Sequence, residues 1–245
     1  MNASTLTSLA TSWALEGYQV NIHAIGDRAN RNAIDALQTA LTSTCSNQDD
    51  LRDCQTRSKR HRIEHSQIIE LSDQQRLFDL GIIPSIQPTH ATSDMSYALS
   101  RLGHARLNTS AYRMHSLLPL SPILGSDFPV EPPSPFAGMY AAIARRNPAS
   151  GLGVDNDGRK DMNVSWYPQE ALSVMQALQG FTLNPARGAF LEGKAGIIRE
   201  GAFADWVVLD EEETVQAWEG DVDRLRTLRV AETWVAGRRV YKRED

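Results

Sequence analysis

Three side chains with the chemistry of metal ligands each follow a short run of β-branched or apolar residues. These side chains are His23, His65 and Asp127. Such runs predict buried strands, and in a barrel of parallel strands the carboxyl ends of the strands form one face. Two imidazoles and a carboxylate that meet there could bind Zn²⁺ or a similar ion through nitrogen and oxygen. Their types and positions therefore predict a metal site.

Each of the three also has a plainer interpretation when it is taken alone. A single histidine after a strand is more often a core or turn residue than a ligand. Asp127 stands between Ser126 and Phe128, and it could cap a helix or form an Asx-turn. The shared position of the three side chains at strand ends is what favours the metal site.

Other polar residues near these strands have two possible roles. His90 ends a third predicted strand, where it could hydrogen-bond a substrate or lie in a surface loop. Arg113 could hold a substrate carboxylate or pair with a nearby acid. Glu64 adjoins His65 and should point to the opposite face of its strand. We therefore expect it to be a structural partner of Arg62 or of a helix rather than a ligand. The histidines without such a context are expected to face solvent: His61, His104 and His115.

Strands and helices alternate along most of the chain. Apolar runs predict strands over 19–25, 62–67, 82–87 and 122–126. Helical spacing of apolar residues predicts helices over 4–16, 30–41, 73–80, 111–118 and 168–178. This alternation is typical of βα units around a parallel sheet. Only four such units precede about Leu191, whereas a complete barrel has eight.

The pattern changes after Leu191. Residues 193–200 give a glycine-rich turn-and-strand signal, and 206–209 a strand. Residues 230–241 predict a β-hairpin with its turn at Ala236 and Gly237. We therefore divide the chain into an α/β region at 1–191 and part of a small all-β domain at 192–245.

The composition excludes several classes of protein. The chain has 245 residues with 41% hydrophobic content, which is enough for a sizeable core. Its formal net charge of -5 argues against a nucleic-acid binder. It has no run of ~20 apolar residues, which a membrane span needs. Residues 1–19 contain no Lys or Arg and do not have the pattern of a signal peptide. We expect a cytoplasmic protein that binds neither nucleic acid nor membrane.

The two cysteines, Cys45 and Cys54, both lie in a polar loop region. A disulfide between them is possible. Two free thiols in a cytosolic protein is the interpretation that the sequence favours.

Several motifs together resemble one known family. They are 23–29 (HAIGDRA), 62–67 (RIEHSQ), Tyr112-Arg113, 124–130 (LGSDFPV), 182–186 (TLNPA) and 201–210 (GAFADWVVLD). In this order, and over almost the whole chain, they resemble the amidohydrolase superfamily, in its amidohydrolase-3 or YtcJ-like branch. Each motif alone is short, and their combination is what makes the resemblance specific.

The resemblance implies a fold and an activity. The fold is an α/β partial (β/α)8 TIM-type barrel, strands five to eight, followed by part of a small β-sandwich. His23 and His65 would be the metal ligands of strands five and six, and Asp127 the strand-eight ligand and catalytic proton shuttle. His90 and Arg113 would contact the substrate. The cofactor would be Zn²⁺ or another divalent metal, and the reaction hydrolysis of carbon–nitrogen bonds in N-acyl or N-formyl amines or cyclic amides.

The sequence departs from the family at one point. The family's first strand supplies a His-x-His pair, and this sequence contains none. By the resemblance it begins in the helix before strand five, so we expect a fragment. One hypothesis is a hydrolase that needs a homo-oligomer or a missing N-terminal half to close the barrel, since open strand edges favour association. The alternative is a non-catalytic remnant that acts as a binding or interaction protein.

Overall fold

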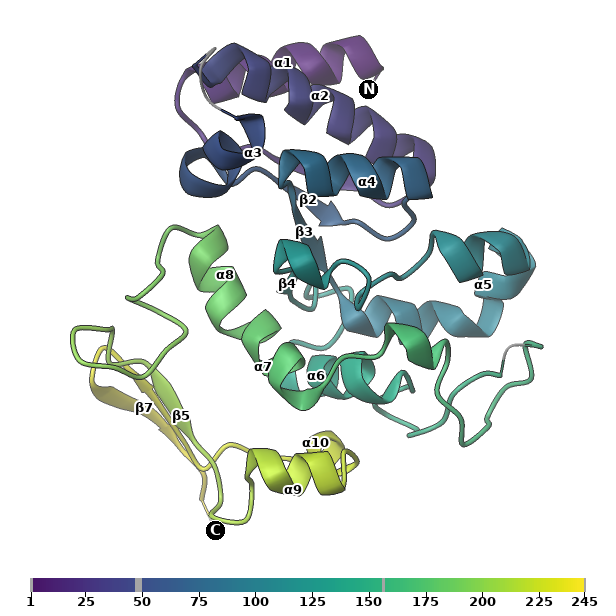
Figure 1. Cartoon of the computed structure of the whole chain (residues 1–245). Coiled ribbons are helices and arrows are strands. Elements are labelled where there is room, and N and C mark those ends of the chain that lie inside the picture. The colour runs from purple at the N-terminus through teal and green to yellow at the C-terminus, as the bar shows by residue number, and fades with distance from the viewer. Residues whose placement is uncertain (1, 47–49, 156, 245) are drawn as a thin grey trace. The chain divides into compact units, whose positions relative to one another are not determined.

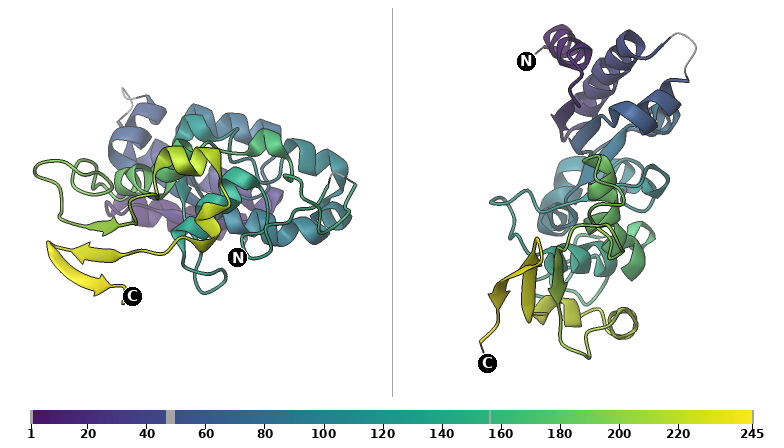
Figure 2. Two further views of the ribbon diagram at one scale, coloured as in Figure 1. Left: turned by 90° about the horizontal axis from the view of Figure 1, so that it is seen from below. Right: turned by 90° about the vertical axis from the view of Figure 1, so that its left-hand side faces the viewer.

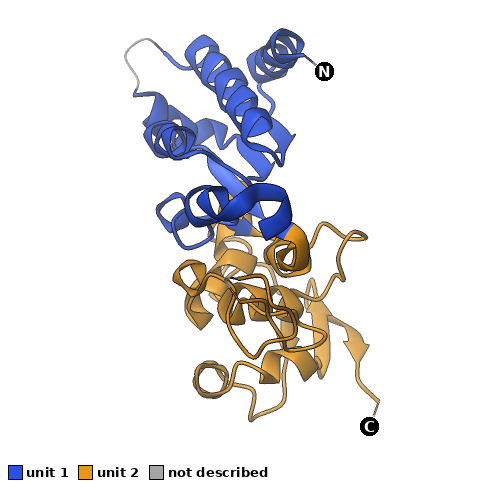
Figure 3. Ribbon diagram, turned by 90° about the vertical axis from the view of Figure 1, so that its right-hand side faces the viewer, with its two compact units in different colours: residues 1–86, 98–123 blue, residues 87–97, 124–245 orange. Residues whose placement is uncertain are grey.

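The computed structural model describes residues 2–46, 50–155 and 157–244 (Figure 1). The chain divides into two compact units (Figure 3). Unit 1 consists of Met1–Ile86 and Ala98–Ile123, and unit 2 of Gln87–Tyr97 and Leu124–Asp245. Within the described residues, no helix has the length and apolar content that crossing a membrane requires.

Unit 1 is built on a parallel sheet. Its strands are β1 (Asn21–Ala24), β2 (Arg62–His65) and β3 (Ile83–Ile86). Strand β2 pairs in parallel with both β1 and β3. The two-residue strand β4 (Ile123–Leu124) comes fourth in the order β1-β2-β3-β4. The four predicted strands are therefore confirmed, each a few residues shorter than its apolar run.

Helices with apolar residues at helical spacing accompany this sheet in unit 1. They are α1 (Ala3–Leu15), α2 (Asp27–Thr44), α3 (Leu51–Cys54) and α4 (Leu71–Leu80). In α2 the side chains of Ile34, Leu37 and Leu41 recur every three or four residues and are fully buried. Helix α4 ends at Gly81, whose φ of 67° is the left-handed conformation that glycine adopts most easily. The predicted helices over 4–16, 30–41 and 73–80 are confirmed.

A long polar helix was not predicted from the sequence. Helix α5 spans Pro88–Thr109 and is broken at Gly103, where φ is 73° and ψ is 164°. The helix predicted over 111–118 is wrong, because those residues form turns before the 3-10 helix η2 (Leu118–Leu120). Few large apolar residues mark the helical period in α5, so its sequence resembles a loop.

Unit 2 contains shorter helices, which are α6 (Pro135–Ala144), α7 (Val174–Phe181), α8 (Leu183–Gly188), α9 (Val215–Gly220) and α10 (Arg224–Thr227). Three of them, α6, α7 and α9, begin with a capping side chain. Helix α7 begins with a capping box formed by Ser173 and Gln176. The helix predicted over 168–178 is partly right, since the 3-10 helix η3 (Pro168–Glu170) comes before α7.

The last strands of unit 2 form a separate antiparallel sheet, visible near the C-terminus in Figure 2. It contains β5 (Trp206–Val208), β6 (Glu232–Val235) and β7 (Arg238–Lys242). The turn between β6 and β7 is at Ala236 and Gly237, with φ of 50° and 72°. Two positive φ angles are typical of the type I′ turns that join tight hairpins. The predicted hairpin is confirmed, and residues 193–200 form turns without a strand.

The two cysteines form a disulfide, so the preference for free thiols was wrong. Cys45 directly follows α2 and Cys54 ends α3, and their Cα atoms are 6.1 Å apart. That separation lies within the usual range for disulfides. In the sequence both residues lie in a polar stretch, which does not indicate a disulfide. Only the fold, in which the end of α3 lies beside the end of α2, brings the two cysteines together.

Candidate metal centre

A pair of imidazoles lies on the two neighbouring strands β1 and β2 of unit 1. The Nδ1 atom of His23 is 2.9 Å from the Nε2 atom of His65. Their rings cross edge to face, with centroids 4.5 Å apart and an interplanar angle of 78°. His65 is the last residue of β2 and is only 6% exposed, whereas His23 is exposed. The sequence prediction that both histidines lie at adjacent strand ends is correct.

The backbone at the end of β2 has an uncommon conformation. His65 has a φ of 75° and Ser66 a φ of 44°, both in the left-handed region. Non-glycine residues are uncommon there, and such conformations are found preferentially at functional sites. The Ser66 hydroxyl donates a hydrogen bond to the carbonyl of Ile63 at 3.0 Å, which stabilises this turn. The turn ends the strand while the His65 imidazole stays beside His23.

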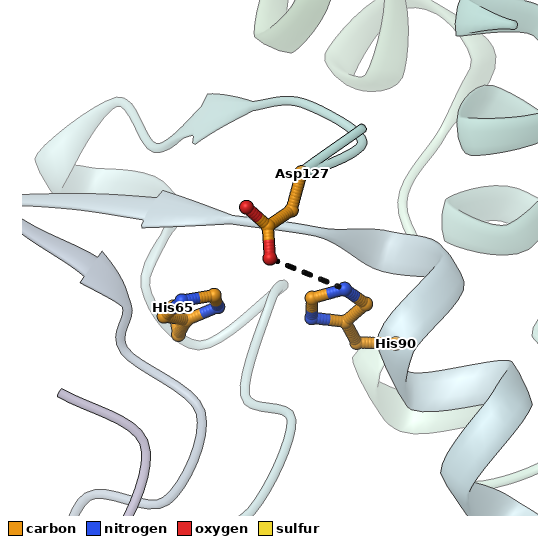
Figure 4. Close-up of side chains that lie close together, drawn as sticks. All are labelled: His65, His90 and Asp127. Atoms are coloured by element: carbon orange, nitrogen blue, oxygen red, sulfur yellow. Dashed lines mark ion pairs between the residues drawn. The ribbon is translucent and has the colours of Figure 1, made fainter. Parts of the chain in front are cut away.

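A second pair, His90 and Asp127, lies in unit 2. His90 is in the first turn of α5, and Asp127 comes shortly after β4 with a φ of 57°. Figure 4 shows their ion pair, in which His90 Nε2 is 4.0 Å from Asp127 Oδ2. The Asp127 side chain is 41% exposed and that of His90 is 12% exposed. An accessible carboxylate beside an imidazole is a suitable arrangement for proton transfer.

The loop that carries Asp127 is held by hydrogen bonds within unit 2. The Val130 N–H donates to the Asp127 carbonyl at 2.8 Å, which closes a tight turn. The Ser93 hydroxyl, on α5, donates to the Glu131 carboxylate at 2.6 Å. These contacts hold the loop against the helix that carries His90. The segment after Asp127 is therefore tied to the helix that carries His90.

The donor atoms of the first pair fit a divalent metal. Two nitrogens of a tetrahedral zinc site, each about 2.05 Å from the metal, are ~3.3 Å apart. The two histidine nitrogens are 2.9 Å apart. They would have to separate by only about 0.4 Å to bind one ion. Without a metal, a hydrogen bond between two imidazoles needs a proton on one nitrogen, and a metal would replace that proton.

The remaining candidates make contacts of their own. Arg113 donates from Nη1 to the carbonyl of Asn108 at 2.9 Å, near the end of α5, and its substrate-binding role stays a prediction. Glu64 is the structural partner that was predicted, since its Oε1 is 3.0 Å from Arg62 Nε. His104 and His115 are exposed as expected.

The prediction for His61 was wrong, because this residue is completely buried. Its Nδ1 accepts a hydrogen bond from the Val20 N–H at 3.0 Å. Burial, with a smaller effect of Lys59, lowers the pKa of His61 to about 4. His61 therefore stays neutral near pH 7 and connects the chain before β1 to the chain before β2. The basic residues around it in the sequence gave no sign of this role.

Each unit thus contains one pair of potential ligands: His23 with His65, and His90 with Asp127. The sequence missed the close approach of His90 to Asp127. The signal for it was present, since both residues follow predicted strands. That His23, His65 and Asp127 bind one metal stays a prediction.

Comparison with known proteins finds three relatives, of which two are named as a putative amidohydrolase and a deformylase. The chain is 30% identical over 243 residues to Protein LONG AFTER FAR-RED 3 of Arabidopsis thaliana, and 28% identical over 242 residues to an N-substituted formamide deformylase of Arthrobacter pascens. It is 25% identical over 241 residues to the putative amidohydrolase YtcJ of Bacillus subtilis. Each match covers 98% of this chain and only 37–40% of the relative. The chain therefore spans well under half the length of these relatives.

A solved structure agrees with these matches. An uncharacterized metal-dependent hydrolase from Pyrococcus horikoshii matches with a TM-score of 0.64 and 25% identity, over 83% of this chain and 36% of that one. A Xaa-Pro dipeptidase matches with a TM-score of 0.61 over 99% of this chain and 49% of that one, at 15% identity, which shows the fold alone. Residues 3–241 match the sequence profile of the Amidohydrolase family. This chain therefore belongs to the amidohydrolase family, in its amidohydrolase-3 or YtcJ-like branch.

Proposed function

We propose that the chain forms part of a metal-dependent hydrolase of non-peptide carbon–nitrogen bonds. Strands β1 to β4 would be strands five to eight of a (β/α)8 barrel, and β5 to β7 part of a small β-sandwich. The parallel sheet with its intervening helices and the likeness to a metal-dependent hydrolase support the barrel. The substrates would be N-acyl or N-formyl amines or cyclic amides. The relative named as an N-substituted formamide deformylase supports this class.

The observation that carries the proposal is the histidine pair on β1 and β2. Their nitrogens are 2.9 Å apart, close to the spacing that one zinc ion requires. His23, His65 and Asp127 would hold the divalent metal, with Zn²⁺ favoured by the mixture of imidazole and carboxylate donors. His90 and Arg113 would contact the substrate.

The proposed chemistry assigns one task to each group. When bound, the metal polarises the carbonyl of the substrate and activates the attacking water. Asp127 takes the proton of that water as a general base and returns it to the leaving nitrogen as a general acid. Its exposed side chain allows a substrate to reach the carboxylate. His90, 4.0 Å away, is close enough to orient either the carboxylate or the substrate.

Metal uptake by the purified chain tests the proposal. The chain is equilibrated with Zn²⁺, and bound metal is measured by mass spectrometry after gel filtration. His65→Ala should remove most of the bound zinc, because this side chain is the buried member of the pair. His104→Ala removes an exposed histidine outside the pairs and should leave zinc uptake unchanged. Equal zinc in the wild type and in the His23→Ala/His65→Ala variant would reject the metal centre and favour a non-catalytic interaction protein.

A further inference from the structure

The residues that follow the left-handed turn at Ser66 are bound through their backbone to two other parts of unit 1. We call residues 67–69 the β2 exit segment. Its hydrogen bonds reach the chain after β1 and the chain at the end of α5. They run from the Ile68 N–H to the Ile25 carbonyl at 3.0 Å, from the Ile69 N–H to the Ser110 carbonyl at 2.8 Å, and from the Tyr112 N–H to the Gln67 carbonyl at 2.8 Å.

Two buried amide side chains bind further carbonyls of the β2 exit segment. Asn30, on α2, donates from Nδ2 to the Ile68 carbonyl at 3.1 Å. Gln74, on α4, donates from Nε2 to the Ile69 carbonyl at 2.7 Å and to the Thr109 carbonyl at 2.9 Å. Asn30 is completely buried and Gln74 is only 5% exposed. The β2 exit segment is therefore held from two helices at once.

Asn30 also reaches the end of β1, the strand that carries the other histidine. Its Nδ2 donates to the carbonyls of Ala24, Ile25 and Gly26, at 3.2, 3.1 and 3.1 Å, and Ala24 directly follows His23. The amide has two N–H bonds, which it shares among these carbonyls and that of the β2 exit segment. Its Oδ1 is buried and has no hydrogen-bond partner among the described residues, so this side chain acts through its N–H groups. One side chain thus connects the ends of both strands.

The two helices that carry the amides are tied to each other directly beside them. Arg31 follows Asn30 and Asp73 precedes Gln74 in the sequence. Arg31 Nε is 2.8 Å from Asp73 Oδ2, and the Asp73 side chain is only 3% exposed. Figure 1 shows α2 and α4 side by side. This ion pair holds the two amides in place relative to each other.

The backbone of His65 requires a segment that is held in this way. His65 and Ser66 both have positive φ angles, and such strained conformations persist only where the surrounding structure imposes them. Without the two amides the β2 exit segment is released, and His65 relaxes to a negative φ that turns its imidazole away from His23. The hydrogen bonds of the amides therefore bear directly on the geometry of the histidine pair.

We propose that Asn30 and Gln74 are positioning residues for the histidine pair. They hold the ends of β1 and β2 so that the two ring nitrogens stay 2.9 Å apart. The inference rests on the proposed metal centre, to which the pair supplies two ligands. Groups that orient metal ligands from outside the coordination shell typically change metal affinity by about 10–100-fold when they are replaced.

NMR of the metal-free chain with isotope-labelled histidine tests the positioning directly. At one fixed pH, the signals of His23 Nδ1 and His65 Nε2 depend on the contact between them, and each is assigned from the spectrum of its own alanine variant. Gln74→Met and Asn30→Leu nearly keep the size of the side chain and remove its N–H groups. In both variants the two signals should move toward those of a free imidazole, which the exposed His104 provides in the same spectrum.

Gly81→Ala is the control for a loss of stability alone. Gly81 follows the last residue of α4, about two turns from Gln74, and its φ of 67° makes any side chain there strained. Urea unfolding measures the stability of each variant. Gly81→Ala should be less stable than the wild type and keep the wild-type histidine signals. If Asn30→Leu does not fold, Gln74→Met decides the outcome, because Gln74 binds only the β2 exit segment and Thr109.

Zinc affinity, measured by competition with a chromophoric chelator, connects the positioning to the proposed function. Both amide variants should raise the dissociation constant by about 10–100-fold, and Gly81→Ala should leave it unchanged. Histidine signals that stay in place in Gln74→Met, or that Gly81→Ala moves equally, would overturn the inference. So would amide variants that bind zinc as tightly as the wild type. A wild type that binds no zinc would reject the metal centre, and the histidine signals would then decide the positioning role by themselves.

Discussion

Removing the disulfide between Cys45 and Cys54 is expected to destabilise unit 1 without removing the histidine pair. The cysteines are separated by 9 positions in the sequence. Closing a loop of this size removes chain entropy from the unfolded state equivalent to about 2.6 kcal/mol at 25 °C. For a chain of this size that loss should lower the melting temperature by about 5–10 °C.

The histidine pair should persist because the start of β2 is held independently of the disulfide. The buried Gln55 side chain donates to the His61 carbonyl at 2.8 Å and accepts from the His61 N–H at 3.1 Å. These hydrogen bonds hold the residue directly before β2. We therefore expect the zinc uptake of the reduced chain to equal that of the oxidised chain.

Thermal unfolding followed by circular dichroism measures the effect of the disulfide. Oxidised wild type, wild type with a phosphine reductant, and Cys45→Ser/Cys54→Ser are compared. The last two should melt at the same lowered temperature, and reductant should not affect the serine variant. Equal melting temperatures for oxidised and reduced wild type would refute the entropic argument. Thiol titration of the unreduced chain is a second test, since two reactive thiols would show that the disulfide does not form.

Three further predictions concern pH, catalysis and a turn. His61 has a pKa of about 4 in the folded chain, below the ordinary 6.5, because it is buried. The contribution of the neutral imidazole to the free energy of unfolding is fully present above about pH 6.5 and is lost as the pH falls toward 4, because the unfolded chain takes up a proton there. The urea-unfolding free energy of His61→Gln should therefore depend less on pH over that range than that of the wild type. The isolated chain should hydrolyse N-substituted formamides negligibly, because a displacement of about 1 Å at a reacting centre can cost on the order of 10²-fold in rate. Adding an N-terminal half with His-x-His should produce formate release, and Asp127→Asn should abolish it; zinc-dependent turnover by the isolated chain would contradict this. Gly81→Ala should destabilise the chain by about 1–2 kcal/mol in urea unfolding, since φ is 67° and the added Cβ would be 2.8 Å from Thr56 Cγ2; an unchanged midpoint would contradict it.

The strands and their terminal side chains could be predicted because both depend on local sequence. A short β-branched run that ends in His23 or His65 determines the strand and where its last side chain lies. The contact between the two imidazoles also needs the pairing register, in which His23 is opposite Glu64 and Ala24 opposite His65. That register depends on packing between segments about forty residues apart, which no local pattern contains.

Helix α5 and the burial of His61 could not be predicted for related reasons. In α5, Ala91, Met95 and Ala98 are buried at helical spacing, but two of them are small and the surrounding residues are polar. His61 lies among basic residues, a context typical of the surface. In the fold, His61 is buried and forms hydrogen bonds with Val20 and Gln55. Val20 is 41 positions away in the sequence, so no local pattern reveals this contact.

The left-handed backbone at His65 and Asp127 has a consequence for protein engineering. Both residues have positive φ angles, 75° and 57°, which glycine adopts with less strain than a residue that has a Cβ atom. A library selected only for heat resistance would therefore favour replacements at these two positions, above all at the partly exposed position 127. Such a selection would remove the proposed ligands while it improved the fold. Stabilising this protein for practical use requires that both positions be held constant.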